Sequence, residues 1–235
     1  RQGHRLDGHG ALLALVNLPE ENYFSRKTLR EDILRLTDRY ADSGYAFAEA
    51  SPSIDKDPRQ KKVNVTINLS KGDLVHINRI IIRGNTRTRD KVIRRRMKVA
   101  ETDVFNASAL KASNESLQRL GYFEEVNITP QPTAAEDLMD ILIEVKERAT
   151  GSFSIGAGYS SVDNLLLMAE ISQDNFLGKG QRLSLQANLS GASTRYNLGF
   201  TEPHFNDSNL LVGFDLYNWS REYDDYTRDS YGFAL

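Results

Sequence analysis

Two-residue alternation across the last third of the chain is the feature that most constrains the fold. In "QRLSLQANLSG", which begins at Gln181, apolar side chains alternate almost without fault with polar ones. Successive side chains of a strand point to opposite faces, so this pattern predicts a strand with one apolar and one polar face. The same pattern returns in "GSFSIGAGY", "LLLMAEISQDNFLG", "RYNLGFTEP" and "NLLVGFDLYNW", with turn signals between them. We therefore expect about five antiparallel strands after residue 150.

The apolar face of these strands has two possible environments. In a soluble β-sandwich it would form a dry core, whereas in a transmembrane barrel it would face lipid and the polar face would line a lumen. Strand lengths of about 9–11 residues, and opposite faces that are polar but rarely ionised, favour the barrel. So do aromatic residues near predicted strand ends, as in an interfacial girdle: Phe176, Phe205, Trp219, Tyr223 and Tyr226.

Composition changes where the alternation begins. Residues 1–149 carry 25 Lys/Arg and 22 Asp/Glu, whereas residues 150–235 carry 5 and 10 and hold 13 of the 21 aromatic residues. We place a domain boundary near Thr150 on this shift. Five or so strands are too few to close a barrel, and "YGFAL" at the end still alternates. We therefore interpret 150–235 as the opening strands of an incomplete barrel.

Residues 1–149 contain a repeat. "GYAFAEASP" begins at Gly44 and "GYFEEVNITP" begins at Gly121, and each follows a helix-like stretch. In the second copy we expect a strand over 75–83, a helix over 89–97 with Thr88 as N-cap, a helix from Asn106 as N-cap, and two strands. Gly121 stands where a left-handed residue would end that helix. The order is β-α-α-β-β, typical of a small α+β module.

The first copy follows the same order but lacks a clear opening strand. "GALLALVNLP" predicts a short helix, and Ser25 is the expected N-cap of a longer helix that ends at Gly44. "KKVNVTINLSKG" predicts a strand with one buried and one solvent-facing side. The opening strand is missing or reduced to the first few residues, so we expect an N-terminally truncated module over 1–72 and a complete one over 73–149.

The order of these segments resembles a known family. "FSRKTLREDI", "INRIIIRGN", "LGYFEEV", "VKERATGSF", "QDNFLGKG" and "TEPHF" are similar, in this order, to the junction of POTRA domains and barrel in the outer-membrane assembly factor (BamA) family. The resemblance covers roughly residues 12–235. It implies a penultimate and a last POTRA domain in tandem, followed by the first strands of an antiparallel transmembrane β-barrel.

The resemblance also implies a function and a location. Proteins of this family assist the folding and insertion of other barrel proteins, so the implied partners are unfolded outer-membrane proteins, periplasmic accessory lipoproteins and outer-membrane lipid. The implied location is the bacterial outer membrane, with the POTRA modules in the periplasm. A two-partner secretion or autotransporter-assembly relative of the same architecture, and a soluble periplasmic β-sandwich binding protein, stay open as alternatives.

Two strands are candidate binding elements. We expect an exposed edge strand in the last POTRA domain to accept a client strand through main-chain hydrogen bonds; it comprises Glu124, Glu125, Val126, Asn127, Ile128 and Thr129. The alternative is an ordinary edge protected by its two glutamates. The first barrel strand is the candidate seam, because glycine weakens a strand; its named residues are Gly151, Phe153, Ile155, Gly156 and Gly158. The alternative there is that the glycines relieve crowding.

A basic run is the third candidate. Residues 79–98 carry nine Lys/Arg against one acid, Asp90. The run contains no aromatic residue for stacking, so nucleic acid is not an expected partner. It is either a solvated helix face or a contact for anionic lipid or an acidic partner; the arginines concerned are Arg87, Arg89, Arg94, Arg95 and Arg96.

No pattern in the sequence predicts catalysis. The chain has no cysteine, no H-E-x-x-H, no G-x-S-x-G and no P-loop, so we expect neither an enzyme nor a bound metal or cofactor. "TEPHFND" brings Glu202, His204 and Asp207 together beside a turn, and we interpret it as a hairpin corner.

Overall fold

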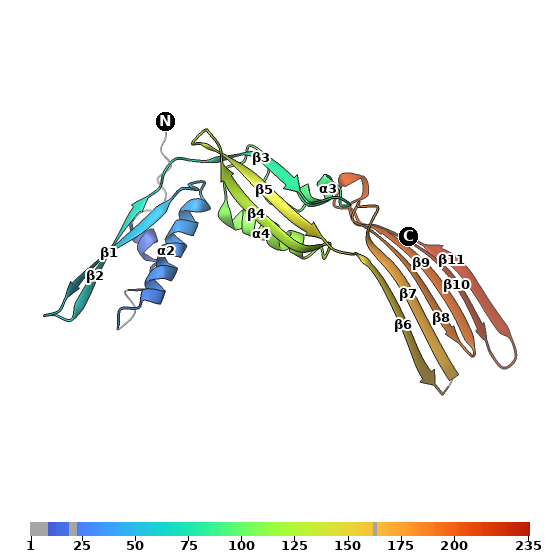
Figure 1. Cartoon of the computed structure of the whole chain (residues 1–235). Coiled ribbons are helices and arrows are strands. Elements are labelled where there is room, and N and C mark those ends of the chain that lie inside the picture. The colour runs from blue at the N-terminus through green and yellow to red at the C-terminus, as the bar shows by residue number, and fades with distance from the viewer. Residues whose placement is uncertain (1–8, 19–22, 162–163) are drawn as a thin grey trace. The chain divides into compact units, whose positions relative to one another are not determined.

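The computed structural model describes residues 9–18, 23–161 and 164–235 (Figure 1). The chain divides into two compact units. One comprises residues 1–81, 97–116 and 127–143, and the other comprises residues 82–96, 117–126 and 144–235. The division runs through the second repeat copy, so each unit contains part of it.

The first repeat copy consists of α1 (His9–Leu13), α2 (Arg26–Ala41), β1 (Glu49–Asp57) and β2 (Lys62–Ser70). Ser25 caps α2 as predicted, because its hydroxyl accepts a hydrogen bond from the Thr28 amide at 3.2 Å. Gly44 follows the helix with φ of +98°, the left-handed conformation expected there. Strands β1 and β2 form a two-stranded antiparallel sheet. The predicted opening strand would fall on residues 1–8, outside the described residues.

The apolar face of β2 is less buried than its alternation suggested. Val63 and Leu69 are each 36% exposed, and Val65 and Ile67 are half-buried. Together with Leu36 of α2 they line an open groove. The prediction of a buried face was wrong because this sheet has only two strands in the described part of the chain, so the helices cover it incompletely.

The second repeat copy consists of β3 (His76–Arg83), α3 (Asp90–Arg94), α4 (Ala107–Gln118), β4 (Phe123–Pro132) and β5 (Leu138–Glu147). Its three-stranded sheet has the order β3-β5-β4, which places β5 in the centre. Strand β5 is accordingly the most buried strand, with Ile141 and Ile143 fully inaccessible. The predicted order β-α-α-β-β is confirmed.

Of the two helix N-caps predicted for this copy, one is confirmed and one is wrong. Asn106 caps α4 as expected, since its side-chain oxygen accepts from the Ala109 amide at 2.7 Å. Thr88 does not cap α3; Arg89 holds that position without a side-chain bond, and the helix is shorter than the predicted 89–97. The reason is tertiary, because both the hydroxyl and the amide of Thr88 are bound by distant residues described below. Gly121 has φ of +71°, as predicted.

The last third of the chain forms a single sheet of six antiparallel strands (Figure 1). Each strand pairs with its neighbours in sequence. Their bounds are β6 (Gly151–Ser160), β7 (Asn164–Phe176), β8 (Gln181–Ser190), β9 (Ser193–Glu202), β10 (Val212–Glu222) and β11 (Thr227–Ala234). Five strands follow the predicted segments, and the terminal "YGFAL" lies in the sixth. We call this sheet the membrane sheet.

Strand register aligns the two kinds of side chain on opposite faces of the membrane sheet. One row crosses all six strands with exposures from 39% to 66%: Phe153, Ile171, Leu185, Leu198, Leu216 and Phe233. The next row lies on the other face and is mostly polar: Ser154, Glu170, Gln186, Asn197, Tyr217 and Gly232. A broad exposed apolar face opposite a polar one suits lipid on one side and water on the other. The described sheet is therefore consistent with the start of a barrel and favours it over the soluble β-sandwich.

One aromatic residue departs from the expected girdle. Trp219 pairs in register with Arg195 and Ser230 on the polar face of the membrane sheet. The guanidinium carbons of Arg195 and Arg228 lie 5.4 and 5.9 Å from its ring centroid. Register therefore places Trp219 on the polar face, where the cation–π contacts stabilise it, and its assignment to a lipid-facing belt was wrong. Separately, the described helices include none with the length and apolarity needed to cross a bilayer.

Candidate functional site

The predicted client-binding residues lie in β4, at one edge of the three-stranded sheet. Val126 and Ile128 are half-buried, whereas Asn127 and Thr129 are exposed, so alternate side chains face outward. Pro130 and Pro132 follow at the end of the strand. Proline lacks an amide donor, so pairing with an added strand would be strongest before residue 130.

The opposite edge, β3, is covered by the chain's own backbone. The Ile77 amide donates to the Asp103 carbonyl and the Thr102 amide donates to the Ile77 carbonyl, both at 2.8 Å. The Ile80 amide donates to the Glu101 side chain at 3.1 Å. Main-chain groups of Ile77 and Ile80 that an incoming strand would need on β3 are therefore already bonded.

The start of β4 carries a charge pair. Lys146 of β5 lies 2.8 Å from Glu124 of β4. This hydrogen bond and its Coulomb attraction lower the pKa of Glu124 and raise the pKa of Lys146. Both groups are exposed, so the pair stabilises little, but it fixes a negative charge on the strand beside Glu125.

The predicted seam strand is β6, an edge of the membrane sheet. Phe153 and Ile155 lie on the exposed apolar face, and Gly156 and Gly158 lie on the polar face. A methyl group at Gly158 would meet nothing within 4 Å, and at Gly156 it would meet only the Met168 methyl at 3.4 Å. Crowding by the described residues therefore does not require glycine at either position.

The basic run does not form one surface. Arg94 is exposed on α3, while Arg95 and Arg96 are half-buried. Arg87 lines a cleft with Thr88 and Glu147. Arg89 lines a different cleft, together with Lys91 and Arg95. The five predicted arginines thus divide among several environments.

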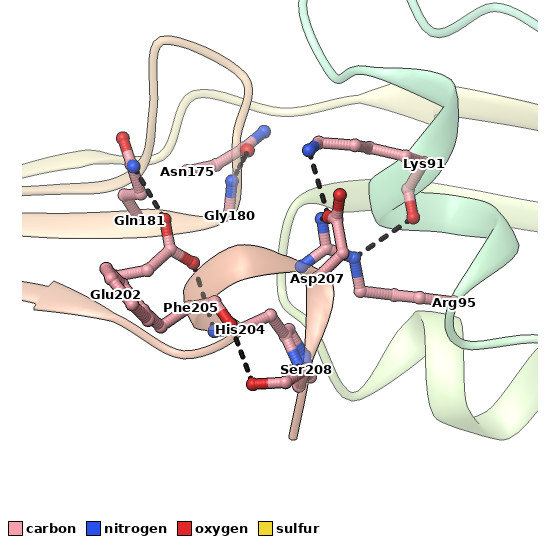
Figure 2. Close-up of polar contacts among 10 residues, drawn as sticks. All are labelled: Lys91, Arg95, Asn175, Gly180, Gln181, Glu202, His204, Phe205, Asp207 and Ser208. Carbon is pink, nitrogen blue, oxygen red and sulfur yellow. Dashed lines mark hydrogen bonds and ion pairs between the residues drawn. The ribbon is translucent and has the colours of Figure 1, made fainter. Parts of the chain in front are cut away.

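The structure reveals a polar centre that the sequence did not predict, where the second module meets the membrane sheet. Asn175, near the end of β7, is 7% exposed, and its amide nitrogen donates to the hydroxyl of Thr88 at 2.8 Å. The same side chain accepts from the Gly180 amide at 2.9 Å (Figure 2). A buried side chain with both ends bonded fixes the turn and its neighbour together.

Glu147, at the end of β5, holds the other side of Thr88. Its carboxylate accepts from the Thr88 amide at 2.6 Å, the Arg87 amide at 2.9 Å and the Thr86 hydroxyl at 2.8 Å. Burial disfavours the charged form of Glu147, but these hydrogen bonds outweigh burial and lower its pKa. The loop 84–89 is therefore tied to the strand that leads into the membrane sheet.

A glycine completes this contact. Gly178 has φ of +70°, and its carbonyl accepts from the Arg89 amide at 2.9 Å. A Cβ at residue 178 would lie 1.9 Å from the Arg87 carbonyl oxygen. Only glycine fits where two backbones approach so closely. We call this contact the second junction. It comprises the bonds of Thr88 to Glu147 and to Asn175, and the close approach of Gly178 to the backbone of residues 87–89.

An ion pair lies beside the second junction. Lys91 of α3 donates to Asp207 of the 3₁₀ turn (Phe205–Asp207) at 2.9 Å, and Arg95 approaches the same oxygen at 3.8 Å (Figure 2). The hydrogen bond from Lys91 and the nearby positive charges lower the pKa of Asp207. The predicted hairpin corner thus also contacts the second module, and Glu202 does not join His204 and Asp207 in a catalytic arrangement but accepts from Gln181 and the His204 amide.

A similar contact, which we call the first junction, connects the two modules. Asp42, at the end of α2, accepts from the amide and the hydroxyl of Ser108 in the first turn of α4, both at 2.7 Å. Asn106 donates to the Asp42 carbonyl, and the Val75 amide donates to the Gly44 carbonyl, both at 2.9 Å. A carboxylate of the first module thus caps a helix of the second.

Two family models match the chain. The POTRA model, described as a surface antigen variable number repeat, matches residues 8–72 and 75–148, and the Omp85 superfamily domain matches residues 175–235. These spans agree with two α+β modules followed by the membrane sheet.

Curated relatives match over nearly the whole chain. The outer membrane protein assembly factor BamA of Nitratidesulfovibrio vulgaris is 38% identical over 235 residues, which is 98% of this chain and 30% of that relative. BamA of Neisseria meningitidis is 30% identical over 204 residues, 86% of this chain and 26% of that relative. The chain therefore spans less than a third of the length of these relatives.

Solved structures agree in fold. A crystal structure of BamA from Haemophilus ducreyi lacking POTRA domains 1–3 superposes with a TM-score of 0.83 at 28% identity, covering 90% of this chain and 41% of that one. CdiB from Escherichia coli superposes with a TM-score of 0.53 at 18% identity, covering 99% of this chain and 44% of that one, a likeness of fold alone.

Proposed function

Since this chain belongs to the outer-membrane protein assembly factor (BamA) family, we propose that it receives unfolded barrel proteins and assists their insertion into the outer membrane. It is an outer-membrane protein with its POTRA modules in the periplasm and the first strands of its barrel in β6–β11. The observation that carries the proposal is an edge strand, β4, in the module that leads directly into a sheet with an exposed apolar face. Unfolded barrel strands need both a hydrogen-bonding partner and a route into lipid.

Client strands bind to the outer edge of β4 in this proposal. Residues 101–103 occupy the β3 edge at Ile77 and Ile80, which favours β4 as the edge for strand addition. Main-chain pairing depends on extended geometry more than on sequence, as a factor with many clients requires. The alternation of Val126 and Ile128 with exposed Asn127 and Thr129 gives an added strand one apolar and one polar neighbouring face.

A crosslinking experiment tests this binding mode. A peptide with the sequence of β10 serves as a model client, and a photo-crosslinker is placed at Asn127 of β4 or, as a control, at Arg79, which lies in the part of β3 that residues 101–103 cover. We expect capture at Asn127 and little at Arg79. Substitution Ile128→Pro should reduce capture at Asn127 severalfold, because proline removes one amide donor and distorts the strand. Equal capture with and without proline would contradict strand addition at β4.

The seam is proposed to form along β6. Its polar face carries only serine and glycine, and Gly156 and Gly158 on that face are not required by crowding within the described chain. We infer that they weaken this strand so that an incoming strand can pair with it. If so, Gly156→Val with Gly158→Val should slow amide exchange in β6 about tenfold through higher strand propensity. Gly213→Val in β10 is the control, and unchanged exchange in β6 would remove the inference.

The remaining partners are proposals of the same kind. We propose that the chain acts through binding and not through catalysis, and that periplasmic accessory lipoproteins contact its second module. Arg94, exposed on α3, supports such a contact because it can meet an acidic partner surface. Substitution Arg94→Glu should weaken capture of such lipoproteins, with Lys111→Glu on α4 as the control; equal capture by both variants would exclude this contact.

A further inference from the structure

We propose that a cleft between helix α3 and two turns of the membrane sheet binds the phosphodiester headgroup of an anionic phospholipid. The cleft encloses about 310 Å³. Its walls come from the residues around α3, the β7–β8 turn and the β9–β10 connection (Figure 2). The inference rests on the proposed function in one respect, since it requires the membrane sheet to lie in a bilayer.

Positive charge dominates the lining of this cleft. Four cations line it, and they come from two separate parts of the chain: Arg89, Lys91, Arg95 and Lys179. Two carboxylates, Glu202 and Asp207, oppose them. The difference of four cations and two carboxylates leaves a formal charge of +2 when His204 is neutral. A cleft of this charge attracts an anion.

The two carboxylates are already engaged. Glu202 accepts from the Gln181 amide at 2.6 Å and from the His204 amide at 3.0 Å. Asp207 is bound by Lys91 and approached by Arg95. Within the described parts of the chain, the guanidinium of Arg89 and the ammonium of Lys179 form no ion pair. Arg89 precedes α3 and Lys179 lies in the β7–β8 turn, and both line the cleft, so we infer that they bind oxygens of the same phosphate group.

A second observation indicates an unfilled polar site. Nε2 of His204, which lines the cleft, is screened from solvent and has no partner among the described residues. Its Nδ1 lies 3.2 Å from the Ser208 carbonyl oxygen. An imidazolium whose Nδ1–H donates to that carbonyl would present Nε2–H to a phosphate oxygen. A ligand oxygen would therefore satisfy a buried polar atom that the protein leaves unmatched.

Apolar side chains of the same turns favour a lipid over free phosphate. Leu177, Phe205, Leu210 and Leu211 are 52% to 65% exposed. They lie in the β7–β8 turn and the β9–β10 connection, at the end of the membrane sheet where β7 and β9 stop and β8 and β10 begin. Free phosphate would use only the cations, whereas a phospholipid would place its phosphate in the cleft and its acyl chains along these residues. Basic and apolar side chains side by side are typical of a membrane–water boundary.

Native mass spectrometry of the whole chain, released from neutral-detergent micelles, can test this. The micelles contain equal amounts of phosphatidylglycerol and phosphatidylcholine with the same acyl chains. We expect the wild-type chain to retain phosphatidylglycerol preferentially. Arg89→Gln with Lys179→Gln should lower the ratio of bound phosphatidylglycerol to phosphatidylcholine about 25-fold, since each of the two cations near an anionic headgroup contributes a factor of about five. This double variant keeps the Lys91–Asp207 bridge.

The matched control removes the same charge elsewhere. Lys56→Gln with Arg59→Gln acts on exposed cations at the β1–β2 hairpin and should leave the ratio unchanged. An equal fall in both double variants would show a general charge effect and overturn the site. Full displacement of phosphatidylglycerol by millimolar inorganic phosphate would overturn the choice of a lipid.

Failure of the headgroup site and failure of the proposed function would give different results in this experiment. If neither lipid is retained by any variant, the membrane sheet does not take up lipid and the proposed function is at fault. If total lipid is unchanged but the wild-type chain shows no preference for phosphatidylglycerol, only the headgroup site is wrong. Unchanged amide exchange at residues 84–96 in the double variant confirms that the second junction is intact, so a lowered ratio reports on the cleft.

Discussion

The first and second junctions each contain a glycine with positive φ and a polar side chain that bonds across the contact: Asp42 bonds the amide and hydroxyl of Ser108, and Asn175 bonds the hydroxyl of Thr88. They differ in what the glycine faces. A Cβ at Gly44 would meet Val104 Cγ1 at 2.4 Å and Leu74 Cδ1 at 2.6 Å, the ends of side chains that can move. A Cβ at Gly178 would meet a main-chain carbonyl at 1.9 Å, which cannot. The polar partner is also more exposed at the first junction, where Ser108 is at the surface, than at the second, where Asn175 is buried.

This difference predicts that the two junctions tolerate displacement to different degrees. A contact made by backbone and buried amides opens as a unit or not at all, whereas one made by movable side chains and an exposed serine can yield in part. We therefore expect the second junction to hold the last POTRA module firmly against the membrane sheet's turn. The first junction should permit adjustment between the modules.

Gly178→Ala should have the largest effect and is the most direct way to break the comparison. The added methyl group overlaps the Arg87 carbonyl and the residue must also keep φ of +70°. We expect a loss of about 3–4 kcal/mol in the free energy of local opening of residues 84–96 and 175–180. Amide hydrogen exchange of the chain in detergent micelles measures this opening.

Gly121→Ala is the matched control for backbone strain. Gly121 has φ of +71°, but a Cβ there would meet nothing within 4 Å. The cost should be about 1 kcal/mol, the conformational penalty alone. If both alanine variants had equal cost, the close backbone approach at Gly178 would not be what stabilises the second junction.

Asn175→Ala comes next in expected size. It leaves the Gly180 amide without its acceptor and the Thr88 hydroxyl without its donor, in a site where water is excluded. About 2–3 kcal/mol should be lost from the same local opening free energy. Asn188→Ala, on the polar face of β8, is the control and should change this opening little. A loss below about 0.5 kcal/mol for Asn175→Ala would mean that the turn is held by Gly178 alone.

The carboxylate of Glu147 gives the second junction a pH dependence. Its pKa is lowered on folding, so its contribution to stability is present above its unfolded pKa of about 4.3 and is lost as pH falls through the folded value. Glu147→Gln should weaken the junction by about 1–2 kcal/mol at neutral pH, because charge-assisted hydrogen bonds from Thr86, Arg87 and Thr88 become neutral ones.

The local stability of the wild-type chain should approach that of the Glu147→Gln variant as pH falls. Opening of residues 84–89 should become easier in the wild-type chain as pH drops below about 4, while the Gln variant should stay nearly constant. Exchange measured from neutral to acidic pH, corrected for the intrinsic amide rate, distinguishes these curves. Parallel curves for both proteins would assign the pH dependence to other groups.

Local features were predictable from the sequence, and the junctions were not. Ser25, Asn106, Gly44 and Gly121 act within a few residues of their own position, so spacing alone identified them. The strands of the membrane sheet were equally accessible, because two-residue alternation is a property of the strand itself. The resemblance to the family supplied the order of modules and sheet.

Errors arose where distant residues decide. Thr88 has the chemistry of an N-cap, but Glu147 and Asn175, 59 and 87 residues away in sequence, take up its amide and hydroxyl. Trp219 has the composition of a girdle residue, but register places it beside Arg195 and Arg228. The one sequence signal for the second junction was the turn "QDNFLGKG", whose positive-φ positions include Asn175 and Gly178. A turn signal gives the local geometry but not what the turn contacts.

Asp42→Ala should have the smallest effect of these variants. It tests the first junction, which we expect to be the weaker of the two. It removes the acceptor for the amide and hydroxyl of Ser108, which is exposed, so water can replace the lost bonds. Loss of such a cap costs about 1 kcal/mol, and Asn106 still caps the same helix through Ala109. Faster exchange confined to the first turn of α4, with residues 84–96 unaffected, is the expected result; Asp38→Ala on α2 is the control. Opening that spread to the second junction would show that the two junctions are coupled and that the first is not the yielding one.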